Sequence, residues 1–362
     1  MSLGKRNVGL DYFRTLAIAF VLLSHSRHLF TYIDGVNWWL LSVGGYLGVE
    51  LFFVLSGFLI GRILIEKVLL VENKVDAFKN FLLRRWFRTL PLYYLILCVY
   101  VVVVSLQQKS LFFSWNHLFF LQNFDSKGLE FFAVSWSLSV EEWFYLFMPV
   151  LLALTMSFVD KTVSQKIFLS IVSLLIIISF VKLSLVYMYP EWTWTDVRKN
   201  IFLRFDSLLI GVMVAYIQGY HREKFNLLGS RKVFVGSILF MIGMVAWYYY
   251  QGDSGLSSDF FSKSLMFPIT SILLSIIMLY FYFHIKRESI LSLYGSRLAY
   301  SIYLIHFLFL DYFIQVSHQY QDAYLSVGFL LLFLCLTVGV SYVLYRFYEL
   351  PVMNLRERFA PN

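Results

Sequence analysis

Charged residues are scarce in this chain: Asp, Glu, Lys and Arg make up 14% of its 362 residues, against roughly a quarter in an ordinary soluble domain. This scarcity excludes a soluble fold, which could not hide hydrophobic residues that reach 59% of the sequence. The apolar residues form runs of roughly 17–22, long enough to cross a hydrocarbon layer about 30 Å thick. The sequence therefore predicts an all-α, polytopic membrane protein.

Several features that mark other classes of protein are missing. The two cysteines, Cys98 and Cys335, fall inside apolar runs and give no disulfide framework. No linker rich in Pro, Gly or Ser and no internal repeat interrupts the chain, which predicts a single transmembrane domain over residues 1–362. There is no cluster with metal-ligand spacing, no Gly-rich phosphate loop and no G-x-S-x-G elbow, so we expect no metal ion.

The apolar runs predict ten transmembrane helices. We place them at 10–30, 45–65, 91–106, 134–157, 167–188, 201–220, 233–250, 264–283, 298–316 and 324–346. A shorter apolar stretch from Leu111 to Leu121 cannot span, and we expect it to be re-entrant or interfacial.

Loop charge predicts the orientation of these helices. The loops on the side of the termini hold 20 Lys and Arg, and the opposite loops hold 6. Basic residues concentrate in cytoplasmic loops, so we expect both termini in the cytoplasm. The same rule accounts for the formal net charge of +8 without a nucleic acid partner.

Ionisable side chains inside the spans are the first candidate site residues, because a charge in the bilayer is costly and usually faces the bundle interior. They are Asp11, Arg14 and His25 in the first span, Glu50 at the start of the second, Glu141 and Glu142 in the fourth, Arg204 and Asp206 in the sixth, and His306 in the ninth.

Arg14 and His25 are the most informative of these residues. Their spacing puts them on one helix face, about 16 Å apart along the axis. A cation near the cytoplasmic end and an imidazole deeper in the helix suit a long donor with a negative head, such as acyl-coenzyme A. A histidine that only satisfies a hydrogen bond in the core is an equally good interpretation.

Two arginines precede the third span, in the loop segment FLLRRWFRTLPLYY. Arg85 and Arg88 are three residues apart, so they project together if the segment is helical. Guanidinium groups bind phosphate oxygens in pairs, which the head group of coenzyme A would need. Taken alone, the segment is better explained as a cytoplasmic anchor with snorkelling arginines.

The segment SWSLSVEEWFYLFMP contains the adjacent carboxylates Glu141 and Glu142. On a helix they point about 100° apart, so only one of them can face His25 and raise its basicity. A pair at the outer interface, among the aromatic residues there, is the alternative.

Three weaker signals follow. Arg204 and Asp206 in RFDSLLIG are most simply a buried ion pair. Tyr303 and His306 in YSIYLIH lie on one helix face, which suffices for a polar pocket. The glycines of SGFLIG have the small-xxx-small spacing that close helix packing uses.

Taken in order, these segments resemble the acyltransferase-3 family of bacterial membrane acyltransferases. LDYFRTLAIAFVLLSHS resembles the family's first helix, with Arg14 and His25, and GVELFFVLSGFLIGRIL resembles its second. RRWFRTLPLYY carries its R-x-x-R element, and SWSLSVEEWFYL its Trp-Ser-Leu, Glu and Phe-Tyr signature. RFDSLLIGVMVA, YSIYLIH and YRFYELP match later helices.

The resemblance implies a multi-pass enzyme of the bacterial cytoplasmic (inner) membrane. Such an enzyme moves an acyl group, usually acetyl, from cytosolic acyl-coenzyme A to a hydroxyl of a carbohydrate or lipid-linked glycan. Many relatives add a periplasmic SGNH-hydrolase-like domain, and the position of Asn362 predicts the standalone type.

The resemblance and the residues together give one hypothesis for the site. Arg14, Arg85 and Arg88 bind coenzyme A, His25 is the general base, and Glu141 or Glu142 orients it. Direct transfer and a covalent acyl-histidine both stay open. Further pocket candidates are Asp11, Ser56, Tyr145, Arg204, Asp206, Tyr303 and His306.

A proton-coupled transporter is the alternative function, because ten helices with buried charges and an inward histidine would suit one. The sequence has no inverted repeat and no paired interrupted helices, which disfavours it.

Overall fold

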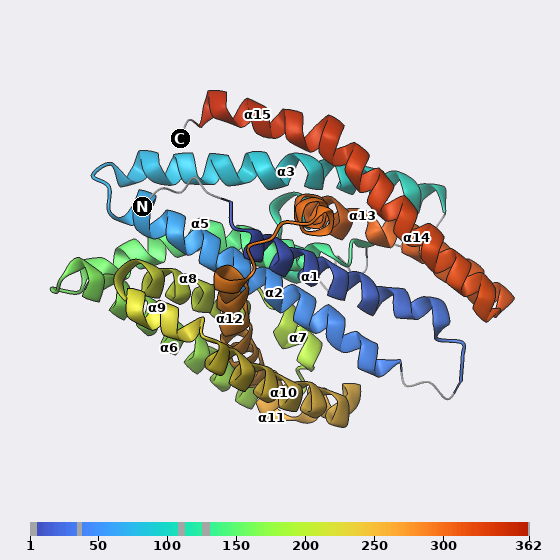
Figure 1. Cartoon of the computed structure of the whole chain (residues 1–362), viewed down its shortest axis with the longest axis horizontal. Coiled ribbons are helices and arrows are strands. Elements are labelled where there is room, and N and C mark those ends of the chain that lie inside the picture. The colour runs from blue at the N-terminus through green and yellow to red at the C-terminus, as the bar shows by residue number, and fades with distance from the viewer. Residues whose placement is uncertain (1–5, 35–37, 108–112, 125–130, 361–362) are drawn as a thin grey trace. The chain divides into compact units, whose positions relative to one another are not determined.

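The computed structural model describes residues 6–34, 38–107, 113–124 and 131–360. The helical elements, in chain order, are α1 (Val8–Ser26), η1 (Arg27–Phe30), α2 (Trp39–Ile63), η2 (Leu64–Leu69), α3 (Lys74–Leu106), η3 (Trp115–Phe119), η4 (Gln122–Phe124), α5 (Ser135–Ser157), α6 (Val163–Met188), α7 (Trp194–Lys199), η5 (Phe202–Arg204), α8 (Phe205–Tyr220), α9 (Arg222–Leu228), α10 (Arg231–Ser258), α11 (Phe260–Ser264), α12 (Met266–His284), α13 (Ile290–Tyr320), α14 (Ala323–Leu344), η6 (Tyr345–Glu349) and α15 (Leu350–Phe359) (Figure 1).

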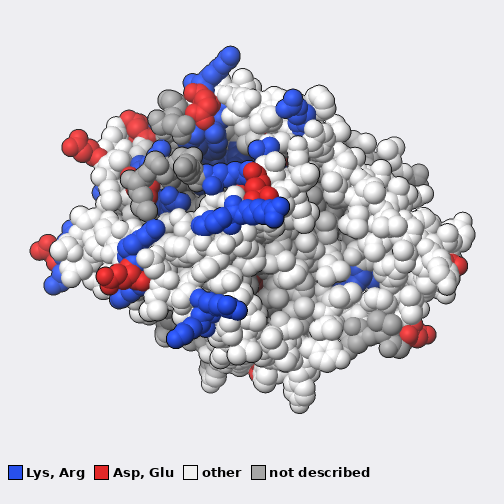
Figure 2. All heavy atoms as spheres, viewed as in Figure 1, with Lys and Arg blue, Asp and Glu red and all other residues white. Residues whose placement is uncertain are grey.

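Ten of the helices in the described ranges are long and apolar enough to cross a membrane. They are α1 with η1, α2 with η2, α3, α5, α6, η5 with α8, α10, α12, α13, and α14 continued through η6 into α15. Most of the face drawn in Figure 2 carries no Lys, Arg, Asp or Glu, as expected of surface that meets lipid. The ten predicted spans are therefore confirmed, whereas the side of the termini stays a prediction.

The chain divides into two compact units, each assembled from separate segments. Unit 1 contains Met1–Arg14, Val49–Phe78 and Val140–Leu293, and unit 2 contains Thr15–Gly48, Lys79–Ser139 and Tyr294–Asn362. The helices α1, α2, α3, α5 and α13 contribute residues to both units. No linker separates the units, and the single domain expected from the sequence stays a prediction.

In unit 1, glycines let α2 and α8 approach closely. A Cβ at Gly57 would collide with the carbonyl oxygen of Leu208, and one at Gly61 would lie 2.8 Å from the Cα of Val212. Helix α8 also packs on α6 and α12, and most of its residues are buried. The small-xxx-small spacing in SGFLIG thus marks a close helix crossing, as predicted.

In unit 2, α1 and α2 also meet at glycines. A Cβ at Gly45 would lie 2.8 Å from Oγ of Ser24, and one at Gly48 would lie 2.8 Å from the carbonyl oxygen of Ala17. Further along, the core of unit 2 joins η1 to α13 and α14 through a buried cluster of Leu29, Leu310, Phe313 and Phe333. The second half of α1 is therefore fixed on two sides.

The third helix begins earlier than the sequence predicted. Arg85 and Arg88 were expected in a loop, but α3 starts at Lys74 and includes both. Pro91 lies inside this helix, although proline removes a backbone hydrogen bond there. Tyrosine hydroxyls of unit 2 bond to carbonyl oxygens beside it: Tyr300 to Thr89 at 2.7 Å and Tyr348 to Pro91 at 3.1 Å. These bonds hold the segment of α3 around the proline against α13 and η6.

The short apolar stretch is only partly described. Leu111 and Phe112 lie outside the described residues, and residues 113–121 contain the 3₁₀ turn η3, with η4 directly after them. The hydroxyls of Tyr93 and Tyr94, on α3, bond to the carbonyl oxygens of His117 and Leu118 at 2.9 and 2.7 Å. The described part of the stretch contains no helix long enough to span, in agreement with the prediction, and its place in the membrane, re-entrant or interfacial, stays a prediction.

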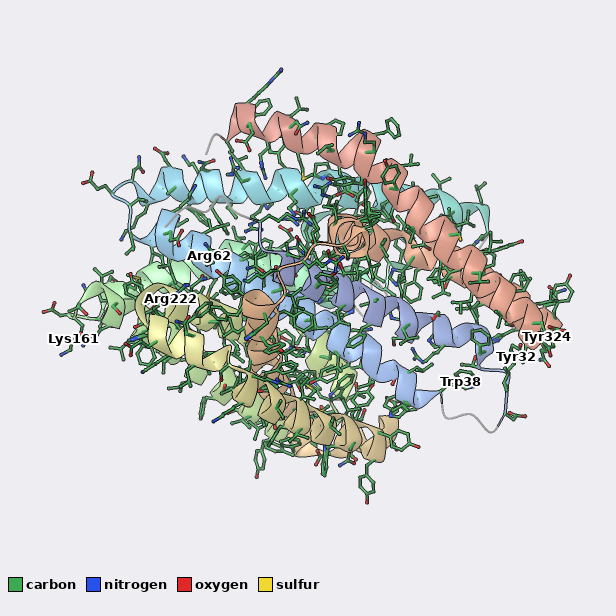
Figure 3. All side chains as sticks on the ribbon, in the orientation of Figure 1. Tyr32, Trp38, Arg62, Lys161, Arg222 and Tyr324 are labelled. Atoms are coloured by element: carbon green, nitrogen blue, oxygen red, sulfur yellow. The ribbon has the colours of Figure 1, made fainter. Side chains whose placement is uncertain are left out.

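Two basic side chains of unit 1 lie in loops that the charge count places on the same side of the membrane. Lys161, between α5 and α6, and Arg222, at the start of α9, lie toward the same end of this unit (Figure 3). The charge count assigned both loops to one side of the membrane. Their common placement agrees with that part of the topology.

Candidate active site

A pair of histidines is the central feature of unit 2. Nδ1 of His25, in the last turn of α1, lies 2.9 Å from Nε2 of His306, on α13. The two rings are nearly parallel, with an interplanar angle of 9°. His306 is completely buried and His25 is half-buried. Two predicted site residues, 281 positions apart, therefore form one hydrogen-bonded pair.

The surroundings of this pair restrict both rings. The ring of Phe307 packs against His25 and His306 with centroids 4.7 and 4.9 Å away. Nδ1 of His306 lies 3.1 Å from the carbonyl oxygen of Ile302 and 2.8 Å from that of Tyr303, both in the preceding turn of α13. His306 is thereby held by its own helix and by its neighbour in sequence.

Tyr303 lies one turn before His306, and its ring centroid is 6.0 Å from that of the imidazole. Its hydroxyl donates to the carbonyl oxygen of Val134 at 2.9 Å and accepts from the hydroxyl of Ser137 at 2.6 Å. These contacts tie α13 to the start of α5. The predicted pocket residue therefore has a clear structural contact beside the histidine pair.

Unit 1 brings together three other predicted residues. The hydroxyl of Tyr145 donates to Oε2 of Glu141, one turn earlier on α5. The hydroxyl of Ser56, on α2, lies 3.1 Å from that of Tyr145. Tyr145 is buried and Glu141 is half-buried. Because His25 belongs to unit 2, the expected contact between a glutamate and His25 stays a prediction.

Unit 1 also contains a network of buried charges. Nη2 of Arg204 lies 2.5 Å from Oε1 of Glu50, and its Nε lies 3.6 Å from Oδ1 of Asp206. Lys182, on α6, pairs with the other oxygen of Asp206. All four side chains are at most 2% exposed. The predicted pair of Arg204 and Asp206 is present, but each also has a partner that sequence reasoning missed.

Hydroxyl groups complete this network. Glu50 accepts hydrogen bonds at Oε2 from Ser207 at 2.9 Å and from Ser271 at 3.0 Å. The guanidinium of Arg204 lies over the ring of Phe267 at 4.1 Å. Two cations and two anions balance, which is the condition under which charges tolerate burial. Glu50 was expected to open the second span; it lies in the interior of α2, which begins at Trp39.

The arginines of α3 in unit 2 differ in their contacts. Arg84 binds the carboxylate of Glu357 at 3.0 Å and the carbonyl oxygen of Ala360, so α3 and α15 lie side by side (Figure 1). Arg85 is half-buried with its guanidinium 5.9 Å from the ring centroid of Phe81, and Arg88 is exposed. Arg84 is thus an anchor, and its neighbours stay the candidates for binding a donor.

The start of α1 lies in unit 1. Asp11 accepts a hydrogen bond from Nε of Arg6 at 2.5 Å, and Arg6 also pairs with Glu288. A carboxylate in the first turn is favoured by the helix dipole. Asp11 is therefore engaged in an ion pair, and Arg14 is half-buried one turn later.

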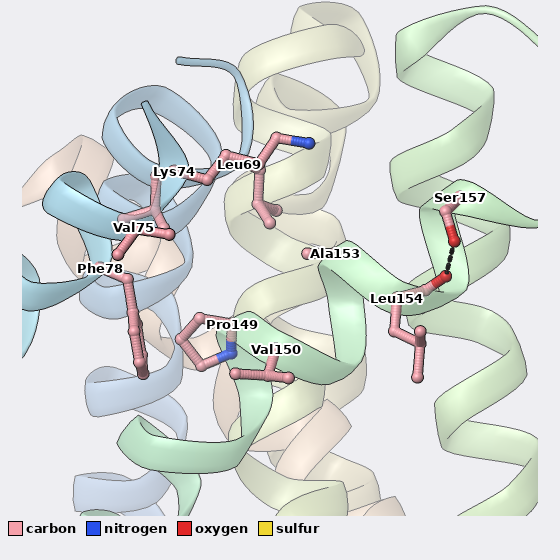
Figure 4. A pocket seen from close by; sticks show the side chains of 10 residues that line it. Leu69, Lys74, Val75, Phe78, Pro149, Val150, Ala153, Leu154 and Ser157 are labelled. Atoms are coloured by element: carbon pink, nitrogen blue, oxygen red, sulfur yellow. Dashed lines mark hydrogen bonds between the residues drawn. The ribbon is translucent and has the colours of Figure 1, made fainter. Parts of the chain in front are cut away.

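A pocket of about 410 Å³ lies in unit 1, and none of the predicted catalytic residues lines it. Figure 4 shows that Val75 and Phe78, from α3, face Pro149 and Val150, from α5, with Lys74 nearby. The lining is almost entirely apolar, which suits a hydrocarbon chain better than a nucleotide. Sequence reasoning did not predict this pocket, because its walls come from three separate segments that only the fold brings together.

The sequence model of an acyltransferase domain matches residues 7–346. The chain belongs to the acyltransferase-3 family. The match covers both histidines of the pair, the arginines of α3 and the glutamates of α5. The acyltransferase-3 resemblance seen in the motifs is thereby confirmed.

Curated relatives are named for O-acetylation. A Staphylococcus aureus protein named as a candidate O-acetyltransferase is 26% identical over 98% of this chain and 59% of its own length. The peptidoglycan O-acetyltransferase OatA of Listeria monocytogenes is 30% identical over 59% of this chain and 34% of its own length. The acyltransferase-3 chain thus spans about 59% of the first of these relatives. No solved structure matches it.

Proposed function

We propose that this chain is a membrane O-acetyltransferase of the bacterial inner membrane, with acetyl-coenzyme A as donor and a carbohydrate or lipid-linked glycan as acceptor. Family membership supports acyl transfer. The names of the relatives, peptidoglycan O-acetyltransferases among them, support a glycan hydroxyl as acceptor. The observation that carries the proposal is the hydrogen-bonded pair of His25 and His306 inside a bundle of membrane helices.

His25 acts as general base in this proposal. Its imidazole takes the proton of the acceptor hydroxyl while the oxygen attacks the carbonyl carbon of the thioester. The carbon–sulfur bond then breaks, the thiolate of coenzyme A takes a proton and leaves, and the acetyl ester remains on the acceptor. Exclusion of water from the helix interior suppresses hydrolysis of the thioester.

The donor-binding groups are arginines. Arg14, Arg85 and Arg88 bind the phosphates of coenzyme A from the cytoplasmic side, where the charge count puts the termini. Arg85 and Arg88 lie three residues apart on one regular helix, so their guanidinium groups project to one side. Glu141 or Glu142 stays the candidate from the sequence for tuning the base, and the hydrogen bond from Tyr145 holds Glu141 in one position.

The decisive experiment uses the purified full chain in detergent. Release of coenzyme A from acetyl-coenzyme A is measured for the wild type and for His25→Ala, with His318→Ala as the matched control. His318 is also on α13 in unit 2, but it bonds to the backbone oxygen of His28 at 2.8 Å. We expect His25→Ala to lose activity roughly 10²- to 10⁴-fold, the usual contribution of a general base, while it still binds the donor.

Two outcomes would overturn the proposal in different ways. A wild type that neither binds nor consumes acetyl-coenzyme A refutes the donor, and proton-coupled solute flux from the same preparation then favours a transporter. A folded and fully active His25→Ala refutes the assigned base alone. His318→Ala should keep its activity and its melting temperature. That result would show that the activity lost in His25→Ala does not follow from removing just any histidine.

A further inference from the structure

We propose that His306 is a positioning residue that fixes the tautomer of His25, so that Nε2 of His25 is the atom that takes the acceptor's proton. This inference rests on the proposed function for the identity of the base. It goes beyond that function by naming the reacting nitrogen and the residue that selects it.

The first step concerns the hydrogen atoms on His306. Its Nδ1 lies within hydrogen-bond distance of two backbone carbonyl oxygens, those of Ile302 and Tyr303. A carbonyl oxygen can only accept, so Nδ1 must carry the hydrogen. The ring is completely buried, where an imidazolium would cost far more than a neutral ring. His306 is therefore neutral, and its Nε2 carries a lone pair.

The second step passes this assignment to His25. Nε2 of His306 lies 2.9 Å from Nδ1 of His25. Because the first of these atoms accepts, the second must donate and therefore carries a hydrogen. A neutral imidazole has only one N–H. Nε2 of His25 is thus the basic nitrogen. This atom lies close to α2, since a Cβ added at Gly45 would be 3.9 Å from it.

The arrangement of the two histidines is rigid because backbone carbonyl groups fix the first hydrogen bond. The two carbonyl groups belong to residues three and four positions before His306 on α13, so the geometry is set within one helix turn. The nearly parallel rings and the packing of Phe307 against both restrict their rotation. No ionised group is needed to set the tautomer, which suits a site where charge is costly.

During transfer, the same hydrogen bond stabilises the charged base. When Nε2 of His25 takes the proton, the ring becomes an imidazolium and its Nδ1–H bond to His306 strengthens. His306 here has the orienting role that a carboxylate has in a serine protease triad. A neutral partner stabilises the imidazolium less than a carboxylate does, so its loss should cost less than loss of the base itself.

The test reads the tautomer directly by ¹⁵N NMR of the full chain labelled at histidine, with the His25 signals assigned by their absence in His25→Ala. In the wild type we expect Nδ1 of His25 to be protonated and Nε2 unprotonated. In His306→Leu the signals should shift toward the Nε2–H tautomer. His306→Gln should restore the Nδ1–H form, because its side-chain oxygen can accept the same hydrogen bond.

Kinetics supply the second readout. We expect His306→Leu to lower kcat roughly 10- to 100-fold, below the effect of removing the base, with KM for acetyl-coenzyme A unchanged. His306→Gln should recover part of that loss. The matched control is His284→Leu, since Nδ1 of His284 also lies 3.1 Å from a carbonyl oxygen of its own helix, that of Tyr280, but in unit 1.

The outcomes separate this inference from the proposed function. An Nε2–H tautomer of His25 in the wild type overturns the inference, and so does a His306→Leu variant with an unchanged His25 spectrum. A wild type without transferase activity but with the expected tautomers refutes the proposed function and leaves the geometric assignment in place.

Discussion

The two units both place ionisable side chains inside membrane helices, but they use them differently. In unit 1, Glu50, Lys182, Arg204 and Asp206 are almost completely buried, and two positive charges match two negative ones. In unit 2, His25 and His306 form a hydrogen-bonded pair, and His25 is only half-buried. A closed and balanced network holds helices together, whereas a half-buried imidazole in such a pair is a candidate for accepting a proton.

This difference refines the rule that an ionisable residue in a span marks a functional site. Each carboxylate of the network receives more than one donor, as Glu50 does from Arg204, Ser207 and Ser271. Burial and charge balance, rather than the presence of charge alone, distinguish the structural cluster from the candidate chemical one.

Removing one member of the network should have the largest effect on stability. Arg204→Leu leaves Glu50 buried without its guanidinium partner, and we expect a loss of about 3–5 kcal/mol in the free energy of unfolding. Denaturant unfolding in detergent measures it. Arg222→Leu, an exposed arginine of unit 1, is the control and should stay within about 0.5 kcal/mol. A stable Arg204→Leu that loses transfer would break the comparison, since the network would then be chemical.

A change of backbone spacing in unit 1 should have a smaller effect. Gly57→Ala forces the added Cβ against the carbonyl oxygen of Leu208, and we expect a loss of about 1–3 kcal/mol. Gly219→Ala, on α8, meets nothing within 4 Å and should be neutral or slightly stabilising. Thermal unfolding compares the two. If folded Gly57→Ala keeps the kcat of the wild type, the contrast between a structural unit 1 and a chemical unit 2 becomes sharper. Equal stability of the two variants would contradict the close crossing of α2 and α8.

The smallest expected effect separates binding from anchoring in unit 2. Arg88→Ala should raise KM for acetyl-coenzyme A about tenfold, since a charge-assisted hydrogen bond is worth roughly 1.5 kcal/mol. Arg84→Ala loses its bond to Glu357 and should lower stability only slightly, because water screens an exposed ion pair, without changing KM. Initial rates at varied donor concentration measure both. A KM raised equally in the two variants would mean that general positive charge, rather than Arg88, attracts the donor.

Much of the fold could be predicted because the bilayer requires long apolar helices, and every one of the ten predicted runs corresponds to a helix. The helix ends were less predictable. The start of α3 was missed because residues 74–90 are polar enough to resemble a loop and Pro91 resembles a helix start. The tyrosines that bond beside this proline come from distant parts of the chain, so no local sequence pattern predicts these contacts.

The candidate site was predictable as a set of residues but not as a set of contacts. His25 and His306 were both candidates, yet no sequence pattern paired them, and Nδ1 of His25 lies 2.9 Å from Nε2 of His306. Lys182 was not among the candidate residues, although it pairs with Asp206. A buried lysine needs an anion, but the sequence offered several and nothing local to choose between them.

The sequence by itself determined the solvent, the number of spans and the family, because hydropathy and short ordered motifs are local properties of the chain. Only the tertiary structure decided which ionisable groups meet. Hydrogen bonds act over about 3 Å, and residues as far apart in sequence as His25 and His306 come within that distance only when their helices pack. Helix packing therefore decides that the ionisable residues form a closed ion network in unit 1, and that His25, the candidate base, meets His306 in unit 2.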